Sequence, residues 1–223
     1  MYITQTLRRA VQLNADGIAT IYADRRQTWR EFQDRVSRLA GGILSLGIKP
    51  GDRVAILALN SDRYMEYFYA VPWAGAAVNP VNIRLSPQEI AHTLNDSEST
   101  ALVVDDNFTS LLPSLRPLLT SVDQIIYAGE QTEPDGCINY ESLIKTAQPV
   151  NDANAGGDTL SGLFYTGGTT GRSKGVMLSH DNLVFNALNV VAEMGYDLNT
   201  VYMHAGPMFH LADMASTFAV TLA

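Results

Sequence analysis

The sequence predicts an α/β fold in which helices flank a mostly parallel sheet. Short continuous apolar runs recur along the chain, and such runs are typical of strands that are buried on both faces of a sheet. Segments with apolar residues at helical spacing separate these runs, and strands joined by helical crossovers favour parallel pairing. With 223 residues, of which 46% are hydrophobic and 17% are charged, the chain can also bury a substantial core.

Capping signals predict three helices in the first half of the chain. In each, a hydroxyl, amide or carboxylate side chain precedes the first apolar residue of helical spacing. Two of the signals are complete capping boxes, with a glutamate three residues after the cap. The residues are Thr28 with Glu31, Asn60 to Asp62, and Ser86 with Pro87 and Glu89. The aromatic residues of the second helix have the spacing of a core helix rather than of a platform for stacking bases.

Apolar runs predict five strands, of which the first is expected to be buried on both faces, and two further helices are predicted in the second half of the chain. The strands are expected at residues 54–59, 101–104, 124–128, 160–165 and 176–178. Ser179 is expected to cap a helix over 181–194, and an apolar stripe predicts a last helix from residue 211 onward.

The one polar, turn-rich stretch long enough to be a linker is 148–158. We therefore predict an N-terminal α/β subdomain over residues 1–150 and the start of a second subdomain over 151–223. The apolar stripe of the last helix runs to Ala223 without a C-cap or a polar tail, which indicates that the chain is a truncated piece of a longer protein.

Charge and composition exclude several classes of function. Fifteen basic and twenty-three acidic residues give a net charge of −8, so a broad electrostatic surface for nucleic acid or anionic lipid is not expected. The apolar runs are too short for a membrane span, and the N-terminus has its charges after its apolar residues, the reverse of a secretory signal. The single cysteine, Cys137, favours a cytoplasmic location.

Residues 166 to 175 predict a loop that binds phosphate. They place four glycines, three threonines and a lysine between two predicted strands. Glycines let successive backbone N–H groups converge on an anion, threonine hydroxyls can donate to it or face a metal ion, and lysine adds a mobile positive charge. A plain hairpin turn, the alternative, needs only two or three residues and no lysine. The candidate binding residues are Thr166, Gly167, Gly168, Thr169, Thr170, Gly171 and Lys174.

Two familiar phosphate-binding patterns do not fit this loop. The pattern of nucleoside triphosphatases requires Gly-Lys-Ser/Thr, but Arg172 and Ser173 separate Gly171 from Lys174, and Gly175 follows the lysine. The dinucleotide-binding pattern opens a helix, whereas a strand follows here.

The loop resembles the Tyr-Thr-Ser-Gly-Thr-Thr-Gly-x-Pro-Lys-Gly-Val segment of the adenylate-forming, AMP-binding enzymes, which include the acyl-CoA synthetases. Gly167 stands where serine is usual and Ser173 where proline is usual. Earlier segments, Leu46 to Ala55 and Gly75 to Leu85, are also similar to family segments, so the resemblance covers the whole chain. Matching loop positions are Tyr165, Thr166, Gly168, Thr169, Thr170, Gly171, Lys174, Gly175 and Val176.

The resemblance implies an ATP-dependent acid–thiol ligase and assigns roles to residues. The loop from Thr166 to Lys174 would hold the β- and γ-phosphates of ATP, with Mg²⁺ bridging them and Thr166 facing the metal. Pro207 to His210 resembles the segment whose histidine lines the acyl pocket, which makes His210 the candidate catalytic residue. The implied partners are a small carboxylic acid of the fatty-acid type, ATP, coenzyme A and the missing C-terminal part of the same protein. A homodimer is an open expectation.

Three interpretations remain open at this point. The later family motifs are not found in this chain, so we expect an N-terminal portion of an acyl-CoA ligase that is inactive by itself. An amino-acid-activating adenylation domain is a second interpretation, because Asp213 supplies a carboxylate where the family often has glycine. A nucleotide-binding module that has lost catalysis is the third.

The other histidines are expected to have structural roles. His180 stands at a helix start, which favours a capping or surface role. His204 is expected to pack within a short strand that also contains Val201, Tyr202 and Met203. His92 lies far from the others in the sequence, so no metal-ligand spacing is present.

Overall fold

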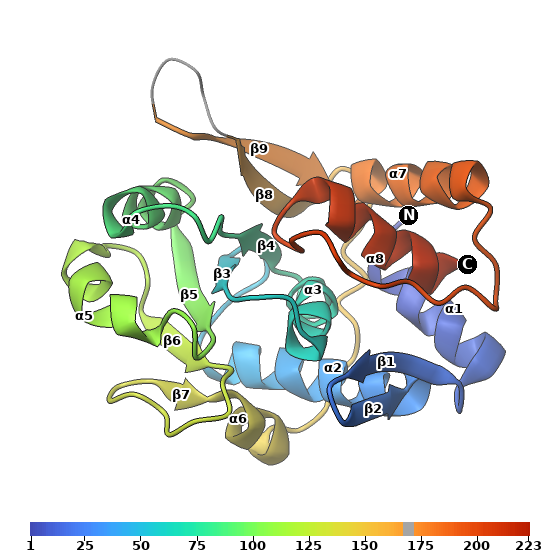
Figure 1. Cartoon of the computed structure of the whole chain (residues 1–223), viewed down its shortest axis with the longest axis horizontal. Coiled ribbons are helices and arrows are strands. Elements are labelled where there is room, and N and C mark those ends of the chain that lie inside the picture. The colour runs from blue at the N-terminus through green and yellow to red at the C-terminus, as the bar shows by residue number, and fades with distance from the viewer. Residues whose placement is uncertain (167–171) are drawn as a thin grey trace.

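In the computed structural model, residues 1–166 and 172–223 are described, and the central loop residues 167–171 lie outside this description. Within the described ranges, seven strands form one sheet in the order β7-β6-β5-β3-β4-β8-β9 (Figure 1). Neighbouring strands are parallel except β8 and β9, so the predicted, mostly parallel sheet is confirmed. The strands are β3 (Arg53–Leu57), β4 (Ala77–Pro80), β5 (Ser99–Val104), β6 (Gln124–Tyr127), β7 (Ile138–Asn139), β8 (Leu160–Thr166) and β9 (Lys174–Ser179).

Helices cover both faces of the sheet. They are α1 (Thr4–Asn14), α2 (Trp29–Ser45), α3 (Asp62–Trp73), α4 (Pro87–Asp96), α5 (Leu112–Leu115), α6 (Tyr140–Thr146), α7 (His180–Met194) and α8 (Leu211–Leu222). Strand β3 shows the two faces: Val54 and Ile56 pack in the large core with α2 and α3, whereas Ala55 and Leu57 pack with α4. Burial of both faces of a strand is what a continuous apolar run predicts.

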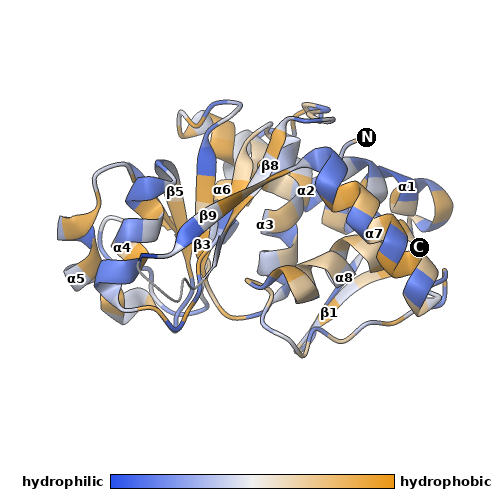
Figure 2. Ribbon diagram, turned by 90° about the horizontal axis from the view of Figure 1, so that it is seen from above, coloured by the Kyte–Doolittle hydropathy of each residue, from blue (hydrophilic) through white to orange (hydrophobic). Residues whose placement is uncertain are grey.

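The predicted helix starts are confirmed. Thr28 and Ser86 form complete capping boxes, and Ser61 and Ser179 accept hydrogen bonds from the backbone of the first turn. The predicted core helix, α3, is buried along its entire length. In Figure 2, α8 carries mainly apolar and neutral colours, whereas α7, which packs on it, alternates between hydrophilic and hydrophobic residues. Helix α7 therefore covers part of α8.

Several elements were not predicted, and one predicted strand is wrong. The additional elements are α1, α6, the strands β4 and β7, and a separate antiparallel hairpin of β1 (Ile18–Tyr22) and β2 (Arg25–Thr28). The strand expected at residues 201–204 is not formed, because no strand of the described chain pairs with this segment. Val201 and Met203 are 91% and 81% exposed there.

The segment 148–158 contains neither helix nor strand, but it is not detached from the first 147 residues. The indole Nε1 of Trp73 donates to the Val150 carbonyl at 2.9 Å, and the Ala153 N–H donates to the Trp73 carbonyl at 3.0 Å. Beyond this segment, β8 joins the same sheet beside β4. The subdomain boundary placed here stays a prediction.

No helix within residues 1–166 and 172–223 is both long enough and apolar enough to cross a bilayer.

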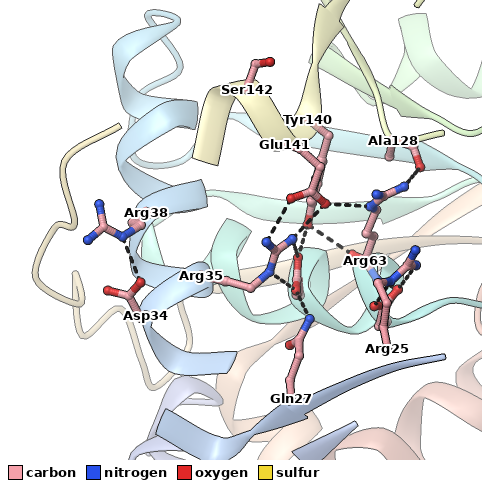
Figure 3. Close-up of polar contacts among 12 residues, drawn as sticks. Arg25, Gln27, Asp34, Arg35, Arg38, Arg63, Ala128, Tyr140, Glu141 and Ser142 are labelled. Carbon is pink, nitrogen blue, oxygen red and sulfur yellow. Dashed lines mark hydrogen bonds and ion pairs between the residues drawn. The ribbon is translucent and has the colours of Figure 1, made fainter. Parts of the chain in front are cut away.

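A buried polar network joins α2, α3 and α6 to the hairpin (Figure 3). The Glu66 carboxylate is fully buried and accepts from Arg35 Nε at 2.6 Å, from Gln27 Nε2 at 2.8 Å and from the Tyr140 hydroxyl at 2.8 Å. Arg35 also donates twice to Glu141 at 2.9 Å. Burial opposes the charge of Arg35, but these carboxylates raise its pKa above the ordinary value. A buried carboxylate with several donors holds these elements in one arrangement.

His180 is buried, so its expected surface role is wrong. Its side chain is 1% exposed, and its Nδ1 accepts a hydrogen bond from the Ile3 backbone at 3.2 Å. Burial, together with the nearby N-terminal ammonium, lowers the pKa of His180 from 6.5 to about 4. The partner residue is 177 positions away in the sequence, which is why local pattern did not reveal the contact.

The low pKa of His180 predicts a loss of stability in acid. Between pH 6.5 and 4 the unfolded chain binds a proton at this ring and the folded chain does not, so unfolding becomes more favourable as pH falls. We expect a contribution of about 2–3 kcal/mol to be lost between pH 7 and pH 4.5. Urea unfolding at both pH values measures this. His180→Asn keeps an acceptor for Ile3 and should show a shallower pH dependence; an unchanged slope would contradict the assignment.

Candidate nucleotide and carboxylate site

The described ends of the predicted phosphate loop lie opposite each other. Thr166 is the last residue of β8, Lys174 is the first of β9, and the two are register partners in the antiparallel pair. Side chains of directly opposed residues project from the same face of a hairpin. Both residues are exposed, and within the described residues Lys174 forms no ion pair. A hydroxyl and an uncompensated ammonium therefore flank the mouth of the loop.

The five central loop residues predicted to bind phosphate fall outside the described chain. They are Gly167, Gly168, Thr169, Thr170 and Gly171. Their role stays a prediction.

Tyr165 attaches the loop end of the β8–β9 hairpin to α4. Its hydroxyl donates to Asp96 Oδ2 at 2.6 Å, and burial together with this carboxylate raises the pKa of Tyr165. The ring lies against the opposite strand, because a Cβ atom on Gly175 would approach it to 3.0 Å. Glycine at position 175 therefore lets the tyrosine ring cross the hairpin just below Thr166 and Lys174.

The segment that carries His210 is hydrogen-bonded to a residue that follows the carboxyl end of β3. Asn60 follows this strand, and its amide Nδ2 donates to the carbonyls of His204 at 2.9 Å and Gly206 at 2.6 Å. Its Oδ1 accepts from the Met208 N–H at 2.8 Å. His210 itself is the N-cap residue of α8, and its ring is exposed with its centroid 4.3 Å from that of Phe209.

The two parts of the site share one edge of the sheet. Strands β3, β4 and β8 are adjacent and parallel, so their carboxyl ends, followed by Asn60 and ending in Thr166, lie at the same edge. Two strand spacings separate β3 from β8, or roughly 10 Å. Ligands of open α/β sheets bind at this carboxyl edge. The sheet thus brings the mouth of the predicted phosphate loop and the support of the His210 segment to one side.

His204 pairs with Asp213, so the packing role expected for this histidine is wrong. Its Nδ1 lies 2.6 Å from Oδ2 of Asp213, a residue that is 4% exposed, and the Tyr202 hydroxyl lies 3.4 Å from Oδ1. Asp213 was the residue on which the interpretation as an amino-acid-activating domain depended. Because its carboxylate is turned toward His204 and Tyr202, it is not presented to a substrate amine.

A cavity of about 690 Å³ opens beside the His204 end of this segment. Its wall is mostly apolar and combines the β1–β2 hairpin with α1, α3 and α8, but His210 is not part of it. Residues lining it include Trp29, Asn60, Met65, His204, Met208 and Thr217.

Comparison with known proteins identifies the family. The model of the family described as AMP-binding enzyme matches residues 7–223. The chain belongs to this family. A long-chain-fatty-acid–CoA ligase of Thermus thermophilus is 38% identical over 200 residues, which are 88% of this chain and 36% of that protein. The 4-hydroxybutyrate–CoA ligase 2 of Metallosphaera sedula is 34% identical over 227 residues, covering 96% of this chain and 40% of the relative.

A solved structure agrees with this assignment. The o-succinylbenzoate CoA synthetase of Bacillus subtilis, in complex with its acyl-adenylate intermediate, matches with a TM-score of 0.81 and 26% identity. The match covers 97% of this chain and 53% of that one. The chain therefore spans about two fifths of the length of the two curated relatives and about half of the solved enzyme.

The described residues 1–166 and 172–223 include a hydroxyl at the loop mouth that could face a metal ion carried by a nucleotide. Among these residues, no group of three or more histidine, cysteine, aspartate or glutamate side chains could hold a metal. Mg²⁺ commonly keeps several waters and binds through one or two protein ligands together with substrate phosphates. The exposed Thr166 hydroxyl at the loop mouth fits that pattern.

Asn60 is the site residue that sequence reasoning missed. Its place between a buried strand and Ser61 suggested only a helix cap, and Ser61 performs that role. A polar residue shortly after a parallel strand, at the carboxyl edge of the sheet, was the available signal. Its partners lie 144 to 148 residues away, so only the structure reveals them.

Proposed function

We propose that the chain is the ATP-gripping N-terminal part of an AMP-forming acyl-CoA ligase that activates a carboxylic acid of the fatty-acid class. The observation that carries the proposal is the opposed pair Thr166 and Lys174, at the carboxyl edge of the sheet, in a chain of the AMP-binding family. The name of the Thermus relative supports the fatty-acid class.

The reaction joins two anions, so charge has to be neutralised and the reactants aligned. A carboxylate oxygen attacks the α-phosphorus of ATP, the bond to the leaving pyrophosphate breaks, and an acyl-adenylate forms. The thiolate of coenzyme A then attacks the acyl carbon and AMP leaves. Lys174 neutralises the β- and γ-phosphates during the first step, and Thr166 orients the bound polyphosphate.

Two further roles complete the proposal. Mg²⁺ would be held by the Thr166 hydroxyl and phosphate oxygens, and it supplies positive charge to the departing pyrophosphate. His210 would orient the carboxylate, since its exposed ring follows a segment fixed at the sheet edge. A reducing, cytoplasmic location is proposed on the single cysteine, Cys137.

Pyrophosphate release tests the proposal. The chain of 223 residues is expected to bind MgATP in titration calorimetry but to release no pyrophosphate with a panel of fatty acids. The complete protein is expected to form acyl-CoA from one or more of these acids. Turnover with amino acids instead would support an adenylation domain, and ATP binding without turnover by the complete protein would support a non-catalytic module.

A further inference from the structure

The Asn60 side chain uses all its principal hydrogen-bonding groups on one distant segment. Its two amide hydrogens face the carbonyls of His204 and Gly206, and its oxygen faces the N–H of Met208. Pro207, between the last two, has no N–H to offer, and its carbonyl accepts from the His210 N–H at 3.0 Å. Asparagine alone combines this reach with both donors and an acceptor.

The anchor itself is held on both sides. Asn60 lies between β3, whose last four residues are buried, and Ser61, which caps α3 by accepting from the Tyr64 N–H at 3.2 Å. A polar side chain on such a rigid support can define the position of a loop to within a fraction of an ångström.

The segment is also fixed by Asp213 in the first turn of α8. Its buried carboxylate holds His204, and a Cβ atom on Gly206 would lie 3.3 Å from its Oδ1. The Asp213 N–H in turn donates to the His210 carbonyl at 3.2 Å. Asn60, which follows β3, thus hydrogen-bonds to the backbone of residues 204–208. Asp213 binds the side chain of His204 and so connects the segment to α8.

We propose that Asn60 is a positioning residue that sets the place of the His210 ring at the carboxyl edge of the sheet. The His204–Asp213 pair completes the clamp by preventing the segment from sliding along α8. The importance of this clamp for catalysis rests on the proposed function, because it acts through His210. Its existence is testable without turnover.

Histidine resonances provide the test, because the chain has four histidines and each lies in a different setting. In Asn60→Asp the two donors become a carboxylate that repels the carbonyls of His204 and Gly206. The ring resonances of His204 and His210 in ¹H–¹⁵N spectra of the whole chain are expected to move. Those of His92 and His180 are expected to stay, and they serve as internal references.

Hydrogen exchange gives a second, quantitative readout. In Asn60→Ala the Met208 N–H loses its acceptor, and its exchange is expected to become about 10-fold faster. Should that variant fail to fold, Asn60→Ser, which keeps one short hydroxyl, is measured against the same expectation.

Asn95→Asp is the matched control. Asn95 also clamps a loop, donating to the Leu118 carbonyl and accepting from the Thr120 N–H, both at 2.9 Å. This variant alters the same chemistry at another loop and should leave the His210 ring resonance unchanged.

The outcomes separate this inference from the proposed function. Unmoved His210 resonances together with unchanged Met208 exchange would overturn the clamp, whether or not ATP binds. If MgATP fails to bind the wild-type chain while the Asn60 variants still shift His210, the clamp stands and the ligase proposal loses its support.

Discussion

Replacing Glu66 by leucine is expected to lower the free energy of unfolding by about 3 kcal/mol, the largest effect of any single substitution considered. The change leaves Gln27 and the Tyr140 hydroxyl without the acceptor they share. Arg35 keeps its two bonds to Glu141, which limits the loss. Removing one member of a buried charged network costs far more than removing an exposed pair, because its partners remain desolvated.

Asp34→Ala is the matched control for this experiment. Asp34 and Arg38 form an exposed pair one turn apart on α2, at 2.8 Å, and are drawn beside the network in Figure 3. Its removal is expected to change stability by no more than about 0.5 kcal/mol. Urea titrations of both variants at pH 7 measure the difference. Equal losses for Glu66→Leu and Asp34→Ala would contradict a structural role for the network.

Replacing Lys174 by alanine is expected to weaken MgATP binding about 30-fold, which corresponds to about 2 kcal/mol. The ammonium is exposed at the loop mouth and makes no ion pair among the described residues, so its removal leaves no buried group unpaired. The loss therefore reports on the ligand rather than on the fold. Because exposed charges are screened, the difference should shrink as salt is raised.

Lys145→Ala separates this effect from a general loss of positive charge. Lys145 is an exposed lysine in the last turn of α6, away from the β8–β9 hairpin (Figure 1). Calorimetric titration should give wild-type affinity for this variant at equal ionic strength. Equal weakening by both lysine substitutions would mean that ATP responds to net charge and not to the loop.

Local signals predicted the frame of the molecule. The capping residues Thr28, Ser61, Ser86 and Ser179 act within three residues of themselves, so the chain sequence displays both partners. Apolar runs likewise revealed β3 and β5, because burial on both faces leaves a continuous run, but the buried strand β4 was missed because its sequence, Ala77–Pro80, ends in asparagine and proline.

The site and the buried contacts around it were harder to predict from the sequence, because the residues in contact are far apart along the chain. His180 meets Ile3 and Asn60 meets Met208, at separations of 177 and 148 residues. His204 had the alternation of a strand residue, yet it is fixed by a carboxylate nine residues later. The helix α1 opens without a side-chain cap, so it lacked the signal that revealed the others.

The β8–β9 ribbon has a mechanical consequence. Strand β8 shares one register pair with β4, Val78 with Gly162, but six with β9. The two strands are therefore coupled more tightly to each other than to their neighbour. Tyr165 tethers this ribbon to Asp96, so the end of β8 and the last turn of α4 are fastened to each other.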